Sequence, residues 1–178
     1  EALLSETVYE KISVAGITRK CGISRQAFYK YYSGKDDLSL KMADFFCRRG
    51  FNLTEPFTWQ ELVSHHLTEI KRYENFFCAI AQAQDSIVLF NIMYAMIFPL
   101  YKRMAEFRLK KDLPDDLDFY LNCYCTGGLG MLVKVLKEKN MEEVEVLTQY
   151  FEKTMPPEIH RLLIGSRFPV RLLQFELN

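Results

Sequence analysis

A tight break between two short helical segments constrains this chain more than any other feature of its sequence. Ser13 stands before the apolar positions of the first segment, and Gly22 follows its last residue. Ser24 then stands where it can cap a second helix, over residues 25–32. The pattern predicts two helices joined by a sharp turn, because glycine readily adopts the positive φ that such a helix end often needs.

The two faces of the second helix differ in chemistry. Phe28 and Tyr32 are four residues apart, so they share a face and are expected to pack inward, with Ile23 under the turn. The outward face then carries Arg25, Gln26, Tyr29 and Lys30. In the major groove of DNA, Arg can pair with guanine and Gln with adenine. Side chains that can hydrogen-bond phosphates, and so fix the register, are Tyr29, Tyr31 and Lys35.

Positive charge gathers around the same helices, although the 23 Lys and Arg of the whole chain balance its 23 Asp and Glu. Residues 11–35 contain no Asp or Glu, and their basic residues are Lys11, Arg19, Lys20, Arg25, Lys30 and Lys35. An ordinary solvated face is the alternative interpretation. The absence of acids favours a surface that meets a polyanion.

Residues 9–38 closely resemble the N-terminal domain of the TetR family of transcriptional regulators. The matching positions are Gly22-Ile23-Ser24, Phe28-Tyr29, Tyr32 and Lys35-Asp36-Asp37-Leu38. Thr18 and Cys21 replace the Ala that is usual in the family, and both are small residues.

The resemblance implies an all-helical homodimer that inserts its two recognition helices into successive major grooves of a near-palindromic operator. It implies DNA contacts for Thr18, Ser24, Arg25, Gln26, Ala27, Tyr29, Lys30, Tyr31 and Lys35. The expected function is that of a cytoplasmic repressor that a small-molecule effector releases from double-stranded DNA. The alternative is a regulator of the same fold that is controlled by a partner protein.

The rest of the chain predicts helices and essentially no sheet, for an all-α fold of about nine helices. Ser33 and Asp36 have the form of a capping box, and Thr58 and Glu61 form a complete one. Asn75 is expected to break the pattern, and Asn140 to cap a late helix. Helices are predicted near residues 14–21, 25–32, 35–49, 59–74, 76–83, 86–110 (bent near Pro99), 116–139 and 141–153.

A linker with Pro56 at residues 52–57 is the expected domain boundary. The prediction is a helix-turn-helix DNA-binding domain at residues 1–50 and a helical dimerisation and ligand-binding domain at 51–178. The first residue falls within a predicted helix, which suggests that further residues precede it in the natural protein. The sequence leaves open whether residues 159–178 form a helix.

The predicted helices at residues 116–139 and 141–154 are candidates for the dimer seam. Gly127, Gly128 and Gly130 lie within the first, where each destabilises a helix by up to about 1 kcal/mol relative to Ala. Such glycines often mark a close approach of helices, and a palindromic operator needs a two-fold protein. A kink in a monomeric bundle is the alternative.

Aromatic and methionine side chains are frequent in the middle helices, where they more often form core than ligand sites. Helical bundles that bind apolar guests use the same residue types, and Tyr hydroxyls can orient the guest. We therefore expect a cavity for a small hydrophobic or aromatic effector, lined by Tyr73, Phe77, Phe90, Met93, Tyr94, Tyr120 and Tyr124.

No metal, cofactor, enzymatic activity or membrane partner is expected. The pairs His65-His66 and Cys123-x-Cys125 point in different directions on a helix, and the five cysteines resemble reduced thiols. Phosphate loops and nucleophile elbows do not occur. The apolar stretch Ile87–Tyr101 is shorter than the roughly 18 to 20 residues that span a bilayer, and predicts a buried helix.

Overall fold

The computed structural model describes residues 3, 9–49, 54–83 and 86–173. Within these ranges the chain forms nine α-helices and two short 3-10 helices, and its only β-pairing is one isolated bridge. The predicted all-α fold is therefore confirmed. The elements are η1 (Tyr9–Lys11), α1 (Val14–Cys21), α2 (Arg25–Tyr29), α3 (Lys35–Arg49), α4 (Trp59–Arg72), α5 (Glu74–Gln82), α6 (Ser86–Leu109), α7 (Asp115–Glu138), α8 (Val144–Lys153), α9 (Pro157–Leu163) and η2 (Val170–Leu173).

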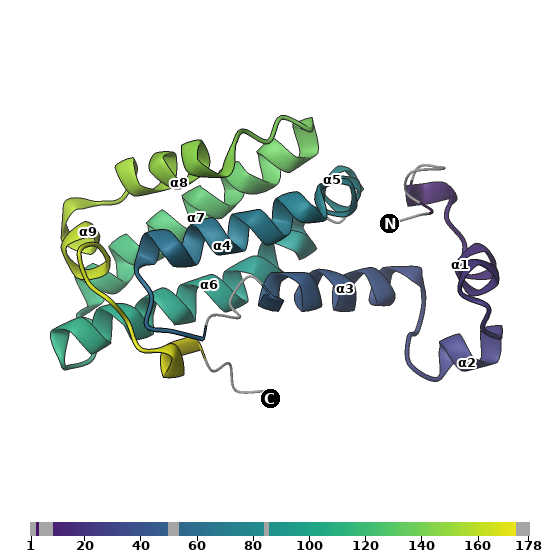
Figure 1. Cartoon of the computed structure of the whole chain (residues 1–178), viewed down its shortest axis with the longest axis horizontal. Coiled ribbons are helices and arrows are strands. Elements are labelled where there is room, and N and C mark those ends of the chain that lie inside the picture. Colours follow the sequence, from purple (N-terminus) through teal and green to yellow (C-terminus); the bar gives the residue numbers. More distant parts are fainter. Residues whose placement is uncertain (1–2, 4–8, 50–53, 84–85, 174–178) are drawn as a thin grey trace.

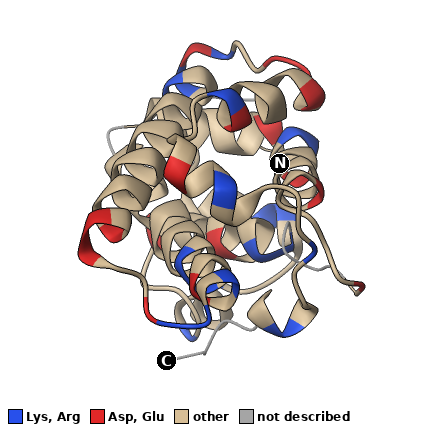
Figure 2. Ribbon diagram, turned by 90° about the vertical axis from the view of Figure 1, so that its left-hand side faces the viewer, with Lys and Arg blue, Asp and Glu red and all other residues tan. Residues whose placement is uncertain are grey.

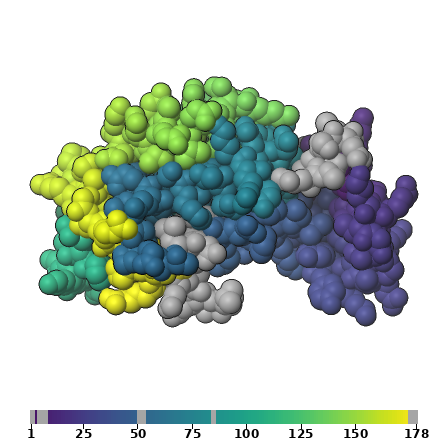
Figure 3. Space-filling model, in the orientation of Figure 1, coloured from purple at the N-terminus to yellow at the C-terminus, as the bar shows by residue number. Residues whose placement is uncertain are grey.

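A small head and a larger body are joined by α3 (Figure 1). The elements η1, α1 and α2 lie beyond the N-terminal end of α3, and α3 packs against α4 and α6. In the space-filling view the head projects from one end of the body (Figure 3). Residues 50–53, where the predicted boundary falls, lie outside the described residues, and Phe57 from the predicted linker is buried in the body.

Two helix starts can be compared with the caps that the sequence predicts. Thr58 forms the full capping box with Glu61, as predicted. At the start of α3 the predicted acid was wrong by one residue, because the carboxylate of Asp37, and not that of Asp36, accepts from the Ser33 backbone N–H at 2.8 Å. Asp36 instead lies 2.7 Å from the Tyr9 hydroxyl.

Three other helix ends were predicted wrongly. α2 ends at Tyr29, three residues early, and α5 begins at Glu74, so that Asn75 lies inside it. Asn140 does not cap α8, because its backbone N–H closes the end of α7 by donating to the Val135 carbonyl at 3.1 Å. α8 therefore begins later, at Val144.

The C-terminal segment, which the sequence left open, is helical and then extended. Pro157 starts α9, and α9 and η2 both pack against α6. Phe168 then pairs with Phe57 through two backbone hydrogen bonds of 2.7 and 3.0 Å, and both side chains are buried. This pairing holds the segment before α4 against the tail.

The longest apolar helix, α6, lies at the centre of the body and contacts α3, α5, α7 and α9. It is longer than the apolar stretch seen in the sequence, and by length and composition alone it would also suit a membrane span. Core helices of soluble proteins pass the same test, and 39% of its most apolar window is buried. α6 therefore packs as a core helix, with one side that is more exposed than the others.

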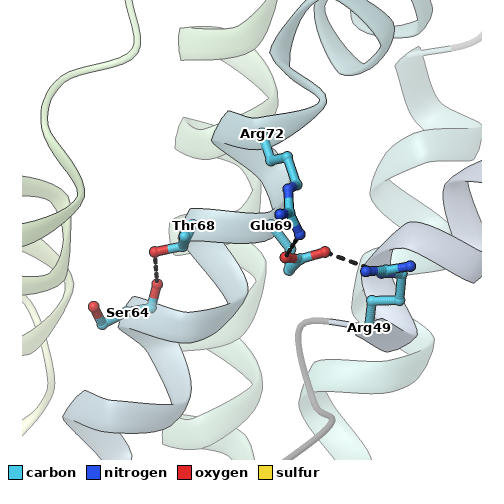
Figure 4. Close-up of polar contacts among 5 residues, drawn as sticks. All are labelled: Arg49, Ser64, Thr68, Glu69 and Arg72. Atoms are coloured by element: carbon cyan, nitrogen blue, oxygen red, sulfur yellow. Dashed lines mark hydrogen bonds and ion pairs between the residues drawn. The ribbon is translucent and has the colours of Figure 1, made fainter.

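A buried carboxylate fastens the end of α3 to α4. Glu69 on α4 is only 9% exposed, and it accepts from Arg49 Nε on α3 at 3.2 Å and from Arg72 Nη1 at 3.0 Å. Figure 4 shows the two guanidinium groups meeting this one carboxylate. Charge-assisted hydrogen bonds of this kind are stronger than neutral ones.

Replacing Glu69 with Gln is expected to lower the free energy of unfolding by about 1 to 3 kcal/mol, because the charge that satisfies both guanidinium groups is lost. The matched control is Glu138→Gln, since Glu138 forms only an exposed pair with Lys134 at 4.0 Å, worth about 0 to 1 kcal/mol. Urea unfolding at one fixed protein concentration measures both. Equal effects of the two substitutions would contradict the role given to Glu69.

Candidate nucleic-acid interface and effector cavity

The turn between α1 and α2 forms as the sequence predicted. Ser13 Oγ accepts from the Gly16 N–H at 3.1 Å at the start of α1. Gly22 has φ 67°, a left-handed conformation, and its N–H donates back into the last turn of α1. Ser24 Oγ accepts from the Ala27 N–H at 3.0 Å, which caps α2. Two local caps and one glycine therefore set the angle at which α2 leaves α1.

The exposed side of α2 carries the polar side chains singled out in the sequence. Phe28 is buried and contacts the rings of Tyr29 and Tyr32 edge-on or tilted. The side chains exposed to solvent are Arg25, Gln26, Tyr29, Lys30 and Tyr31, and Ala27 is half-buried. One packing prediction was wrong, because Ile23 is 45% exposed and does not fill the corner under the turn.

Two predicted phosphate contacts have other partners within the chain. Lys35 Nζ donates to the Tyr9 carbonyl at 3.0 Å and lies 4.3 Å from the Tyr9 ring centre, which ties η1 to the start of α3. Thr18 is 4% exposed, and its hydroxyl donates to the Ala15 carbonyl at 3.3 Å. The Thr18 hydroxyl would have to leave its carbonyl partner to donate to a phosphate, whereas the Lys35 ammonium has three N–H donors and can add a contact. The DNA roles of both residues stay predictions.

The head is also distinct in charge. Viewed from the end of the body opposite the head, acidic and basic residues are interspersed along the helices (Figure 2). Residues 11–35, which include α1 and α2, carry basic residues and no acid. An exposed helix with donors and no nearby acid in its own segment suits a polyanionic surface.

A small cavity lies in the body among α4, α6, α7 and α8. Its volume is about 50 Å³, room for the centres of only a few water molecules. Six aliphatic side chains line it, and the other contributors are Trp59, His66, Tyr101, Tyr124, Cys125, Gly128 and Phe151. The Tyr124 hydroxyl donates to the Phe151 carbonyl at 2.9 Å, so α7 and α8 are linked at this wall.

Most of the predicted ligand residues lie elsewhere. Tyr124 alone among them lines this cavity. The stacked rings of Tyr73 and Phe46 have centres 3.9 Å apart. Phe77 and Met93 are fully buried core residues, and Tyr120 is 41% exposed. Phe90 and Tyr94 stack along α6. Among the described residues, the seven predicted ligand residues therefore do not line one common cavity.

A signal for the cavity was present in the sequence but was not used. Trp59, His66 and the apolar residues between them recur at the i, i+3, i+4 and i+7 spacing on α4, directly after the capping box. That stripe faces the cavity. The partners on α7 and α8 could not be chosen from sequence, because their approach depends on the tertiary packing.

The histidine and cysteine pairs do not gather into a metal site. Among the described residues, no three His, Cys, Asp or Glu side chains are placed to hold one ion. Cys125 is buried, and burial raises the pKa of its thiol to about 12, whereas Cys123 is exposed. The two members of the pair thus point to different surroundings, as expected for an i, i+2 pair.

Comparisons with known proteins agree with the head and the fold. Residues 1–42 match the family model described as bacterial regulatory proteins, tetR family. The solved structure of a protein named dihydroxyacetone kinase operon activator DhaS is similar over 91% of this chain and 92% of that one, with a TM-score of 0.67 and 17% sequence identity. At that identity the likeness concerns the fold. No curated protein matches the chain.

The buried imidazole of His66 gives the fold a pH dependence. Desolvation lowers its pKa from 6.5 to about 4, against the opposing effect of a hydrogen bond with the Cys47 backbone. Between these values the unfolded chain binds the proton and the folded chain does not, so stability is full above pH 6.5 and falls as the pH drops toward 4.

The free energy of unfolding, measured in urea at pH 7.5 and pH 5, should therefore fall less in His66→Leu than in the unchanged chain. The carboxylates are common to both proteins, so the difference isolates His66. Parallel losses in the two proteins would contradict a neutral, buried imidazole.

Proposed function

We propose that this chain, a TetR-type DNA-binding transcriptional regulator by the family match of residues 1–42 and by its fold, acts as a homodimeric repressor. Two copies of α2 would enter successive major grooves of a near-palindromic operator, and a small effector bound in the body would release them. The observation that carries the proposal is the capped, outward-facing α2 on a segment free of acids. In this proposal, repression would come from occupying the operator.

The DNA contacts are assigned by exposure and chemistry. Arg25 and Gln26 stand at the N-terminal end of α2, where recognition helices contact base edges, and both are exposed. Tyr29, Lys30 and Tyr31 follow as phosphate contacts. Ser24 and Ala27 complete the proposed set, although the Ser24 hydroxyl already accepts from the Ala27 N–H as the cap of α2.

The dimer seam is proposed on α7 and α8. A Cβ atom added at Gly127 or Gly130 would meet no atom within 4 Å. Packing inside one chain therefore does not explain why glycine stands at these positions. Beside them, Met131 and Tyr150 are more than half exposed and border an apolar groove of about 400 Å³. A second copy packed on this surface would account for both features.

The same helices suggest how an effector would act on the head. The cavity wall includes His66 on α4, whose pKa is influenced by the Cys47 backbone on α3, and Glu69 on α4 holds Arg49 at the end of α3. A shift of α4 would therefore move α3, which carries the head. Since dimeric readers need half-site centres about 34 Å apart, a displacement of a few ångströms would weaken binding.

Control by a partner protein is a second candidate, and the small volume of the cavity favours it. Ligand sites for drug-sized molecules span roughly 300 to 1,000 Å³. A thermal-shift screen of the full chain with apolar and aromatic compounds separates the two, because only an effector that binds the folded chain raises its melting temperature.

The proposal also includes the domain limits of 1–50 and 51–178 and a cytoplasmic location.

Replacing Lys30 with Ala is expected to weaken operator binding about tenfold and to reduce the salt slope of binding by about one, because one phosphate contact is lost. Arg25→Ala should instead relax the preference at one base pair, at a loss of about 1 to 3 kcal/mol. Fluorescence anisotropy on a duplex selected from a random pool by the unchanged chain measures both. Lys111→Ala, in the α6–α7 loop, is the control, and an equal effect there would refute the docking.

Placing a charge in the seam should separate the copies. Met131→Glu and Tyr150→Glu are expected to give monomers in sedimentation experiments at concentrations where the unchanged chain is dimeric, because a lone carboxylate is costly to bury. Ile87→Glu changes an equally exposed apolar residue on α6 and should leave the dimer intact. Dimers in all three variants would place the seam elsewhere.

A further inference from the structure

The cavity among α4, α6, α7 and α8 excludes ions. Among the residues that the structure describes, no Lys, Arg, Asp or Glu lines it, and desolvation lowers the pKa of His66 so that its imidazole is neutral at neutral pH. Burial also raises the pKa of the lining phenols Tyr101 and Tyr124, which stay protonated. An ion placed there would lose its hydration without gaining an opposite charge.

One polar group in this wall lacks an acceptor. Trp59 is fully buried, and its Nε1–H meets no acceptor with hydrogen-bond geometry among the described residues. The ring centres of Trp59 and Tyr101 are 6.2 Å apart, and the indole lowers the pKa of the Tyr101 hydroxyl without a hydrogen bond of standard geometry between them. Buried indoles usually find a partner, and an unmade hydrogen bond at a buried donor is destabilising.

We infer that this cavity binds an uncharged effector with an apolar body and a single hydrogen-bond acceptor, such as a ketone, ester or ether oxygen, which accepts from Trp59 Nε1. The inference rests on the proposed function, because it specifies the effector of that regulator. The apolar wall removes water from the body of the ligand, and the indole selects for the acceptor in a site of low dielectric constant.

Room for such a ligand comes from the wall that the cavity shares with the groove between α7 and α8. The residues common to both are Tyr124, Gly128, Leu132 and Phe151. The Phe151 ring is half-buried and lies 3.4 Å from where a Cβ at position 128 would stand. A rotation of this ring toward the groove joins the two spaces.

The same rotation would connect the ligand to the dimer. The groove lies on the proposed seam, so a displaced Phe151 ring would press on the second copy. Occupancy of the cavity would then alter both α4 and the seam, the two features that set the spacing of the heads.

The test uses the full unchanged chain and two small probes of nearly the same shape, cyclopentanone and methylenecyclopentane, in which a carbonyl oxygen is replaced by a methylene group. Trp59 is the only tryptophan, so ¹⁵N–¹H NMR shows one indole N–H signal. Cyclopentanone should move this signal downfield in a saturable titration, because the N–H becomes hydrogen-bonded. Methylenecyclopentane should not shift it downfield.

A second measurement uses ligand-observed NMR titrations of Trp59→Phe. Loss of the donor should weaken cyclopentanone binding about tenfold and leave methylenecyclopentane binding within about twofold. The cyclopentylammonium ion should not bind either protein. No saturable response to cyclopentanone in the unchanged chain, or equal losses for both neutral probes in the variant, would overturn the inference. Operator binding by the ligand-free chain is measured separately, so a failure of the ligand site is distinguishable from a failure of the proposed regulator.

Discussion

The helix α3 is the element on which the rest of the structure depends, because it belongs to both parts of the molecule. Its first turn receives η1 through Lys35 and Tyr9, and its last turn is fastened to α4 through Arg49 and Glu69. Its middle packs against α4 and α6. A rigid helix with both ends anchored transmits a displacement from one end to the other, so the orientation of the head is a consequence of packing in the body.

The head could be predicted closely because its structure is determined locally. Ser13, Gly22 and Ser24 each act on backbone groups within three or four residues, and all three do what the sequence indicates. The capping error at α3 arose where a distant group competes, because Asp36 meets the Tyr9 hydroxyl across more than 20 residues of chain. Lys35, whose DNA contact stays a prediction, donates to the carbonyls of η1 across a similar separation.

The body was predictable in its helices but less so in its site. The capping box at Thr58 located the start of α4 and Pro114 the start of α7, whereas α8 was misplaced because Asn140 closes the preceding helix. A cavity requires side chains from four helices to converge, and the sequence does not encode their angles in any local pattern. Aromatic residues were therefore assigned to a ligand site when several of them, such as Tyr73 on Phe46, form ordinary core stacks.

The proposed function requires two outward-facing copies of α2 held one helical turn of DNA apart. Cys21, exposed at the end of α1, offers a position for a spin label, and Cys123→Ser removes the other exposed thiol among the described residues. Pulsed electron paramagnetic resonance on the labelled chain, bound to its selected duplex, should give an inter-label distance of about 34 Å, broadened by the label linkers. The absence of any dipolar coupling, or a distance far from one helical turn on bound DNA, would contradict the account.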